Sequence, residues 1–155
     1  MTKKALIIGI SGQDGSYLSE YLLSLGYEVH GILRRNSVAE NQDNRISHLD
    51  VTCHYGDLLD VPSLTRVISS VKPDEIYNLG AQSHVRISFD VPSFTIQTNA
   101  LGVLNLLEIC RAILPDVKFY QASSSEMFGN SIDEDGYQRK TTPMNPTSPY
   151  GCAKV

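Results

Sequence analysis

The stretch GISGQDGSYL, residues 9–18, directly follows the apolar run ALII of residues 5–8. The apolar run predicts a buried strand, and apolar residues at helical spacing after the stretch predict a helix. Glycines at a strand-to-helix turn let the backbone bend sharply, and the helix N-terminus offers unpaired N–H groups to an anion. Gly9, Gly12 and Gly15 therefore indicate a phosphate-binding turn, although a tight turn without a ligand would also place glycines there.

Further apolar runs alternate along the chain with segments that can form helices. This alternation predicts an α/β fold with a Rossmann-like, doubly wound parallel sheet, which we expect as one domain over residues 1–155. In the longest helix we expect Leu104, Leu107 and Cys110 to face the sheet. The expected strands cover residues 5–9, 27–33, 52–55, 75–79 and 117–122, the expected helices 16–25, 62–71 and 93–114, and the expected loops 36–50 and 129–149.

The composition argues against several classes of partner. A net charge of -4, with no basic cluster beyond Arg34 and Arg35, argues against nucleic acid or an acidic membrane surface and favours a small solute. No apolar segment approaches the length of a membrane span, and residues 1–10 lack a cleavage site, so we expect a cytoplasmic protein with no membrane partner. The cysteines and histidines show no disulfide or ligand spacing, so we expect reduced thiols and no metal site.

With a strand before it and a helix after it, the glycine turn predicts a dinucleotide site. The second strand ends in Leu33-Arg34-Arg35, without the Asp or Glu that usually binds a ribose. Guanidinium groups at this place favour the 2′-phosphate of NADP, although both arginines could instead be solvated surface charge. After the third strand, Asp57 beside Leu58 could meet an adenine amino group or could cap a turn.

Two groups of residues near the end of the chain could carry chemistry. Tyr150 and Lys154 are four residues apart and share one helix face, where an ammonium group favours the phenolate and makes the tyrosine a base. After the fifth strand, Ser124 could hydrogen-bond the same substrate oxygen, and Glu126 could act as acid or base. The alternatives are a packed aromatic with a solvated lysine, and a serine turn with a capping or exposed glutamate.

Four stretches, GISGQDGSYL, NLGAQSHV, QASSSEMFG and SPYGCAK, carry a resemblance over essentially the whole chain. They resemble the extended short-chain dehydrogenase/reductase family and, within it, the group of GDP-mannose dehydratases. The resemblance implies NADP as cofactor, GDP-mannose as substrate, and a homodimer or homotetramer for the full-length protein. The residues that it adds to the cofactor site are Gln13, Asp14, Leu79, Ala81, Ser83, Tyr150 and Lys154.

The resemblance also implies a reaction. Tyr150 would remove the proton of the C4 hydroxyl, assisted by Lys154 and by the hydroxyl of Ser124, while a hydride passes from C4 to NADP. Glu126 would then take the C5 proton and help the C6 hydroxyl to leave as water, and the hydride would return to C6. The implied product is GDP-4-keto-6-deoxy-mannose, a precursor of GDP-fucose and GDP-rhamnose.

The chain departs from the family pattern in two respects. Ser124 stands where the family often has threonine, a change that keeps the hydroxyl. The chain stops one residue after Lys154, so we expect an N-terminal portion, truncated before the last strands and the small substrate domain. Two alternatives stay open: a related epimerase, reductase or dTDP- or UDP-sugar dehydratase, and an inactive nucleotide-binding module.

Overall fold

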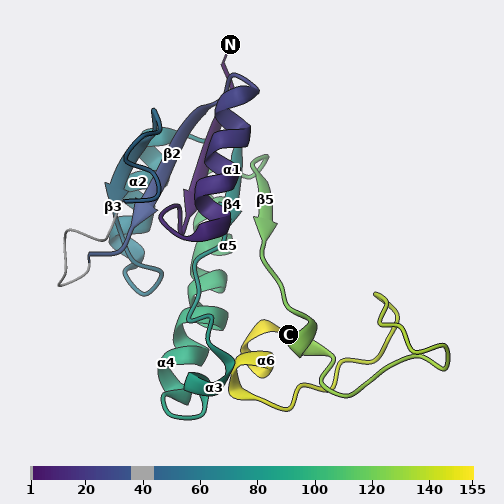
Figure 1. The fold of residues 1–155 in the computed structure, drawn as a ribbon. Helices are drawn as coiled ribbons and strands as arrows, with labels where there is room; N and C mark the ends of the chain where they lie inside the picture. Colours follow the sequence, from purple (N-terminus) through teal and green to yellow (C-terminus); the bar gives the residue numbers. More distant parts are fainter. Residues whose placement is uncertain (1, 36–43) are drawn as a thin grey trace. The chain divides into compact units, whose positions relative to one another are not determined.

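The computed structural model describes residues 2–35 and 44–155, which form two compact units (Figure 1). The first unit contains residues 1–80 and 103–122, and the second contains residues 81–102 and 123–155. The elements of the first unit are β1 (Lys4–Ile8), α1 (Gln13–Ser24), β2 (Glu28–Leu33), β3 (Thr52–Tyr55), α2 (Val61–Val71), β4 (Glu75–Asn78), α5 (Gly102–Ile113) and β5 (Lys118–Gln121). Those of the second are α3 (Val85–Ser88), α4 (Pro92–Ile96), the π-helix η2 (Gln97–Leu101), the 3-10 helix η3 (Ser125–Met127) and α6 (Pro149–Lys154).

The first unit is built on a parallel sheet in the order β3-β2-β1-β4-β5. The chain runs outward from β1 to β3 and then crosses over to β4 on the other side of β1. This confirms the predicted Rossmann-like, doubly wound sheet. Ligands of such sheets bind beyond the carboxyl ends of the strands, at the point where the strand order reverses. That point lies between β1 and β4, directly after Ile8 and Asn78.

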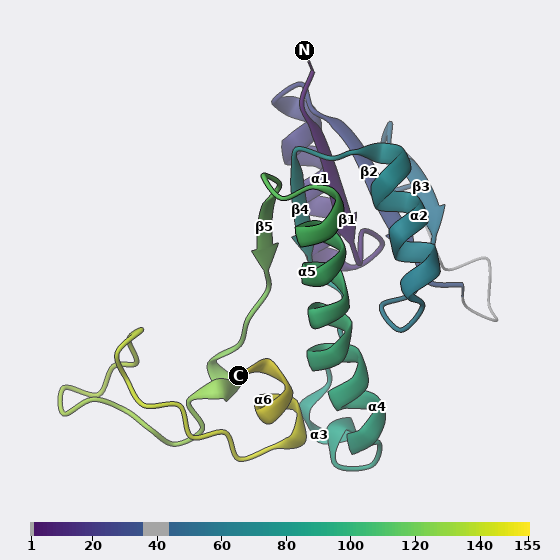
Figure 2. The same ribbon diagram turned by 180° about the vertical axis from the view of Figure 1, so that it is seen from behind.

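Alternate residues of β1 face opposite layers of helices. Leu6 and Ile8 join a buried cluster with side chains of α2 and α5, whereas Ala5 and Ile7 join a second cluster that includes Leu22 of α1. Figures 1 and 2 show α1 on one face of the sheet and α2 with α5 on the other. Burial on both faces explains why the central strand β1 reads as a continuous apolar run.

The longest predicted helix differs from the structure in two ways. Residues 93–114 form α4, η2 and α5 in succession, because the backbone passes through a π-helical turn. The expected orientation was wrong for Leu104 and Leu107, which are 52% and 44% exposed, and right for Cys110. Leu106 and Ile109 face the sheet with Cys110, because these residues recur at the spacings of three and four that keep a helical stripe on one side.

Element boundaries follow the local chemistry of the chain. Helix α1 begins at Gln13 rather than at residue 16, because Gly12 serves as its N-cap. The segments α3 and η3 were not predicted, since each is a single short turn. Residues 129–148 contain neither helix nor strand, whereas residues 36–43 of the other expected loop lie outside the described residues.

Within the described ranges, no helix is both long and apolar enough to cross a membrane.

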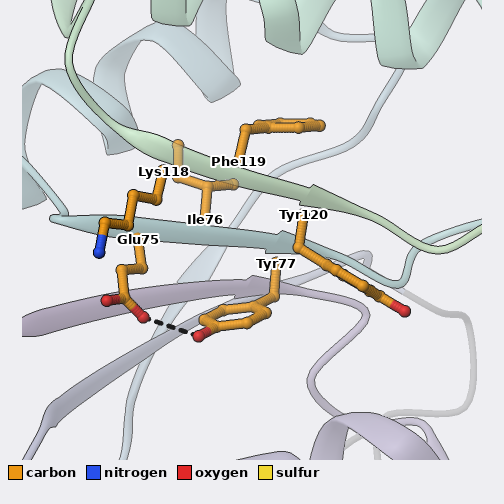
Figure 3. A pocket seen from close by; sticks show the side chains of 6 residues that line it. All are labelled: Glu75, Ile76, Tyr77, Lys118, Phe119 and Tyr120. Atoms are coloured by element: carbon orange, nitrogen blue, oxygen red, sulfur yellow. Dashed lines mark hydrogen bonds between the residues drawn. The ribbon is translucent and has the colours of Figure 1, made fainter.

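A carboxylate of β4 is held in a polar cluster beside the hollow shown in Figure 3. The Glu75 carboxylate accepts hydrogen bonds from the hydroxyl of Tyr77, at 2.7 Å, from that of Tyr27 and from the ammonium of Lys3. Burial, together with the Glu75 carboxylate, raises the pKa of Tyr77 to about 12. The buried acid is therefore fully satisfied by neighbouring donors.

Strands β2 and β3 are joined by a pair of stacked histidines. His30 Nδ1 lies 3.1 Å from His54 Nε2, and His30 Nε2 lies 2.8 Å from the Glu28 carboxylate. The ring centroids are 5.3 Å apart. A hydrogen bond between these two nitrogens needs one ring to donate its N–H and the other to accept with a lone pair. Burial, and then the neighbouring His30, lowers the pKa of His54.

We therefore expect the first unit to lose stability in mild acid. The folded state favours neutral His54, so this contribution is complete above the ordinary histidine pKa of 6.5 and is lost as the pH falls through the lowered value. When the pH is lowered from about 7.5 to about 5.5, the melting temperature should fall less for His54→Asn than for the unchanged protein. An equal fall in both proteins would assign the acid sensitivity to other groups. The stabilising contribution of ionised Glu75 is lost at lower pH than that of His54, because Tyr77 and Lys3 hold the pKa of Glu75 below the ordinary 4.5.

Candidate active site

The glycine turn lies at the reversal point of the sheet. Gly9 adopts a φ of +84°, which favours glycine, and a Cβ there would lie 3.0 Å from the backbone nitrogen of Gly80. The N–H of Gly12 donates to the Gly9 carbonyl oxygen at 3.0 Å, and the N–H of Leu79 donates to the Ile8 carbonyl oxygen at 3.0 Å. The structure thus brings Leu79 beside the glycine turn.

Gly15 lets helix α1 pack directly on the turn. A Cβ at this position would overlap the Gly9 carbonyl oxygen and lie 2.7 Å from the Cα of Ile10. No side chain caps the N-terminus of α1, where Gly12 is the N-cap and Asp14 lies in the first turn. The first-turn N–H groups of this helix therefore fit the pyrophosphate of a dinucleotide, while Gln13 and Asp14 remain exposed beside them.

The side chains predicted around the rest of the cofactor have different surroundings. Arg34 and Arg35 are exposed after the end of β2. Asp57 forms a local turn, because its Oδ1 accepts the N–H of Leu59 at 2.9 Å, which is the capping alternative considered from the sequence. Leu58, only 6% exposed, belongs to the core of the first unit.

In the second unit, a buried asparagine holds the loop that follows β4. The Gln82 N–H donates to Asn99 Oδ1 at 2.8 Å, and Asn99 Nδ2 donates to the Gln82 carbonyl oxygen at 2.9 Å. Thr95 adds a hydrogen bond to the Gln82 side chain. Ala81 and Ser83, which the sequence predicts to bind the cofactor, flank Gln82. Sequence analysis missed this role, for which the only signal is an asparagine inside an apolar helix.

Replacing Asn99 by alanine should loosen this loop. Both backbone groups of Gln82 would lose their partner, and an unsatisfied buried polar group costs about 1–3 kcal/mol. We expect a lower urea midpoint and faster amide exchange over residues 81–84. Asn105→Ala is the matched control, because Asn105 makes a single long bond of 3.4 Å to the Leu58 carbonyl oxygen. Equal effects of both variants would contradict the role of Asn99 in holding the backbone of Gln82.

Helix α6 carries the predicted Tyr150 and Lys154 pair on one face. Tyr150 is 8% exposed, and Lys154 Nζ lies 5.7 Å from the centroid of its ring. Burial lowers the pKa of Lys154, because the charged amine is desolvated. The helix is capped by Ser148, whose Oγ accepts the Gly151 N–H at 3.0 Å. The pair therefore lies in a partly desolvated setting, which strengthens its electrostatic interaction.

Ser124 is the N-cap of η3 and Glu126 lies within η3, which packs against α6. The N–H of Glu126 donates to Ser124 Oγ at 3.2 Å, the local turn considered as an alternative, and this leaves the serine proton for another acceptor. A Cβ on Gly151 would lie 2.6 Å from the Glu126 carbonyl oxygen. Gly151 is therefore a positioning residue that sequence analysis missed, because its role depends on a distant segment.

Each unit assembles one predicted group. The first contains the glycine turn and Leu79, and the second contains Ser124, Glu126, Tyr150 and Lys154 on two packed elements. Cys53 and Cys152 are exposed and Cys110 is buried, and these three residues form no disulfide with one another.

The strand order, the glycine turn and the Tyr150 and Lys154 pair together define a Rossmann-like protein of the short-chain dehydrogenase/reductase class. Among solved structures, a UDP-glucose 4-epimerase of Thermus thermophilus in complex with NAD is 30% identical, with a TM-score of 0.84 over 97% of this chain and 47% of that one. The UDP-Glc/GlcNAc 4-epimerase of Campylobacter jejuni, 23% identical with a TM-score of 0.85 over 98% of this chain and 46% of that one, shares the fold.

Residues 6–155 match the family described as GDP-mannose 4,6 dehydratase, and the chain belongs to this family. A GDP-mannose 4,6-dehydratase of Vibrio cholerae is 50% identical over 164 residues, covering 100% of this chain and 44% of the relative. The GDP-mannose 4,6 dehydratase of Homo sapiens is 50% identical over 163 residues, covering 97% and 43%. The chain spans less than half the length of these relatives.

Proposed function

We propose that the protein that carries this chain is an NADP-dependent GDP-mannose 4,6-dehydratase that forms GDP-4-keto-6-deoxy-mannose. The observation that carries the proposal is the packing of Gly151 on the Glu126 carbonyl, because it sets an acid–base residue against the helix of a tyrosine base. A 4-epimerase or a reductase that acts at C4 needs no base for C5. The names of the relatives support the same substrate and reaction.

In the first unit, a nicotinamide dinucleotide would be held by Gly9, Gly12, Gly15 and the N-terminus of α1, with Asp57, Leu58 and Leu79 around it. The family resemblance adds Ala81 and Ser83 to the residues that would bind it. When bound, this cofactor supplies the acceptor for the C4 hydride and the donor that returns the hydride to C6. The fit rests on the uncapped helix and on the close backbone packing that only glycines permit.

The remaining steps belong to side chains of the second unit. Tyr150 accepts the proton of the C4 hydroxyl, with Lys154 stabilising the phenolate and the Ser124 hydroxyl donating to the same oxygen. The resulting C4 ketone acidifies C5. Glu126 accepts the C5 proton and gives a proton to the C6 hydroxyl, which leaves as water. Carbons C5 and C6 then take up one proton and the stored hydride, so the net change is the loss of one water.

Cofactor choice is proposed to rest on the two arginines after β2. We expect Arg34→Ala combined with Arg35→Ala to weaken NADP binding about 10- to 100-fold, since each bidentate charge-assisted contact to a 2′-phosphate is strong, and to leave NAD binding nearly unchanged. Titration of both cofactors by calorimetry checks this. Equal loss of both affinities would assign the arginines to another role.

The substrate proposal is tested with the full-length protein and NADP. GDP-mannose, dTDP-glucose, UDP-glucose and UDP-galactose are offered in turn, and mass spectrometry scores the loss of one water. Loss from GDP-mannose alone supports the proposal. Epimerisation or reduction without water loss would replace it by the related alternatives, and binding without turnover would favour a nucleotide-binding module.

We further propose that the full-length protein is cytoplasmic and forms a homodimer or homotetramer. The exposed Leu104 and Leu107 on α5 support self-association, because neighbouring exposed leucines mark interaction surfaces.

A further inference from the structure

The first turn of helix α6 has a complete set of hydrogen-bond partners. Pro149, at its first position, has no N–H to satisfy. The Gly151 N–H is taken by the N-cap Ser148, and the Cys152 N–H donates to the Ser148 carbonyl oxygen at 2.9 Å. The remaining donor is the N–H of Tyr150, and its partner comes from outside the helix.

That partner is Ser88, at the end of α3. Its Oγ accepts the Tyr150 N–H at 3.2 Å across a sequence separation of 62 residues. The same hydroxyl donates to the Val85 carbonyl oxygen at 2.6 Å, so its proton is engaged and its lone pairs face Tyr150. Ser88 is 0% exposed, which keeps solvent and substrate away from it.

We propose that Ser88 is a positioning residue that fixes the Tyr150 backbone and, through it, the place of the phenol beside Lys154. The proposal rests on the function assigned above to Tyr150. The phenol extends from the Cα next to the held nitrogen, so a displaced backbone displaces the base. A misplacement of about 1 Å at a reacting group can cost about 100-fold in rate.

The position of Ser88 in the chain makes this contact more than an ordinary helix cap. Ser148 already caps α6 locally. Ser88 instead belongs to the continuous segment that carries Ala81 and Ser83, the predicted cofactor residues, and α3 and α4 both pack on α6. One hydroxyl therefore links the proposed cofactor loop to the helix of the proposed base.

The test uses the full-length protein with Ser88→Ala. We expect kcat with GDP-mannose to fall about 10- to 100-fold while KM changes less than about twofold, because substrate binding groups stay in place and the base is misplaced. Ser88→Thr, which keeps the acceptor oxygen, should restore most of kcat. Ser19→Ala is the matched control, since Ser19 is also 0% exposed but its hydroxyl only donates to the Gly15 carbonyl oxygen.

A fall in kcat/KM that comes from KM alone, or an equal loss in Ser19→Ala, would overturn the positioning role. If Ser88→Ala does not fold, Ser88→Cys keeps a similar volume with a weaker acceptor and should show a smaller loss of kcat in the same direction. Amide exchange gives a readout without turnover: the Tyr150 amide should exchange faster in Ser88→Ala, and unchanged protection would overturn the contact. If the full-length protein without substitutions releases no water from GDP-mannose, that result would overturn the proposed function instead.

Discussion

Replacing Glu126 by glutamine is expected to abolish the loss of water while oxidation at C4 persists. Glutamine keeps the size and the backbone contacts of η3 but can neither accept the C5 proton nor protonate the leaving hydroxyl. Removing a general acid–base group typically costs about 10²- to 10⁴-fold in rate. The predicted trace is a lasting rise in the absorbance of the reduced cofactor, because the hydride cannot return to C6, with no 6-deoxy product in the mass spectrum.

Glu134→Gln is the control for this experiment, because Glu134 is an exposed carboxylate of the loop after η3. It should dehydrate GDP-mannose at the unchanged rate. Persistent elimination in Glu126→Gln would show that another group removes the C5 proton, and Glu126 would then be a structural residue of the turn.

Replacing Gly15 by alanine is expected to destabilise the first unit strongly. The added methyl would overlap the Gly9 carbonyl oxygen and approach Ile10 to 2.7 Å, and backbone atoms at the end of a central strand have little freedom to move away. Alanine in a helix gains about 1 kcal/mol over glycine, whereas overpacking of this kind costs about 3 kcal/mol or more. We therefore expect a net loss of stability, measured by urea unfolding, together with loss of dinucleotide binding.

Gly12→Ala is expected to cause a smaller loss of stability than Gly15→Ala. At Gly12 the nearest atom to an added Cβ is the Gly9 carbonyl oxygen at 3.2 Å, so a small shift of a few tenths of an ångström suffices. Its expected cost is about 1 kcal/mol, close to that of losing a good N-cap. If Gly12→Ala destabilised the protein more than Gly15→Ala, the packing of α1 on the turn would not be the reason for glycine at residue 15.

The sheet could be predicted from the sequence because its signal is local. The apolar run of residues 5–8 is buried on both faces, so hydrophobicity alone marks the strand, and each strand ends within one residue of its expected bounds. The orientation of residues 104 and 107 was missed because leucines occur on several sides of α5, and the π-helical turn before it does not follow the 3.6-residue period.

For the candidate site, the sequence predicts the proposed reacting groups but not the residues that hold them in place. Spacing placed Tyr150 and Lys154 on one helix face, and the serine–glutamate pair after β5 marked a strand end. The residues that hold these groups in place, Ser88, Asn99 and Gly151, act through backbone contacts to segments far away in the sequence. No periodicity or motif reports such contacts, since they depend on how the chain folds back on itself.

The N-terminal turn of helix α6 has a consequence for the order of folding. Nucleating a helix fixes several backbone dihedrals for its first hydrogen bond, so partners from outside the helix favour its start. At this turn the partners are Ser88, which accepts the Tyr150 N–H, and the Glu126 carbonyl, which packs on Gly151, and they are in place only when α3 and η3 have docked. We therefore expect the phenol of Tyr150 to reach its native place late in folding, after these segments have packed.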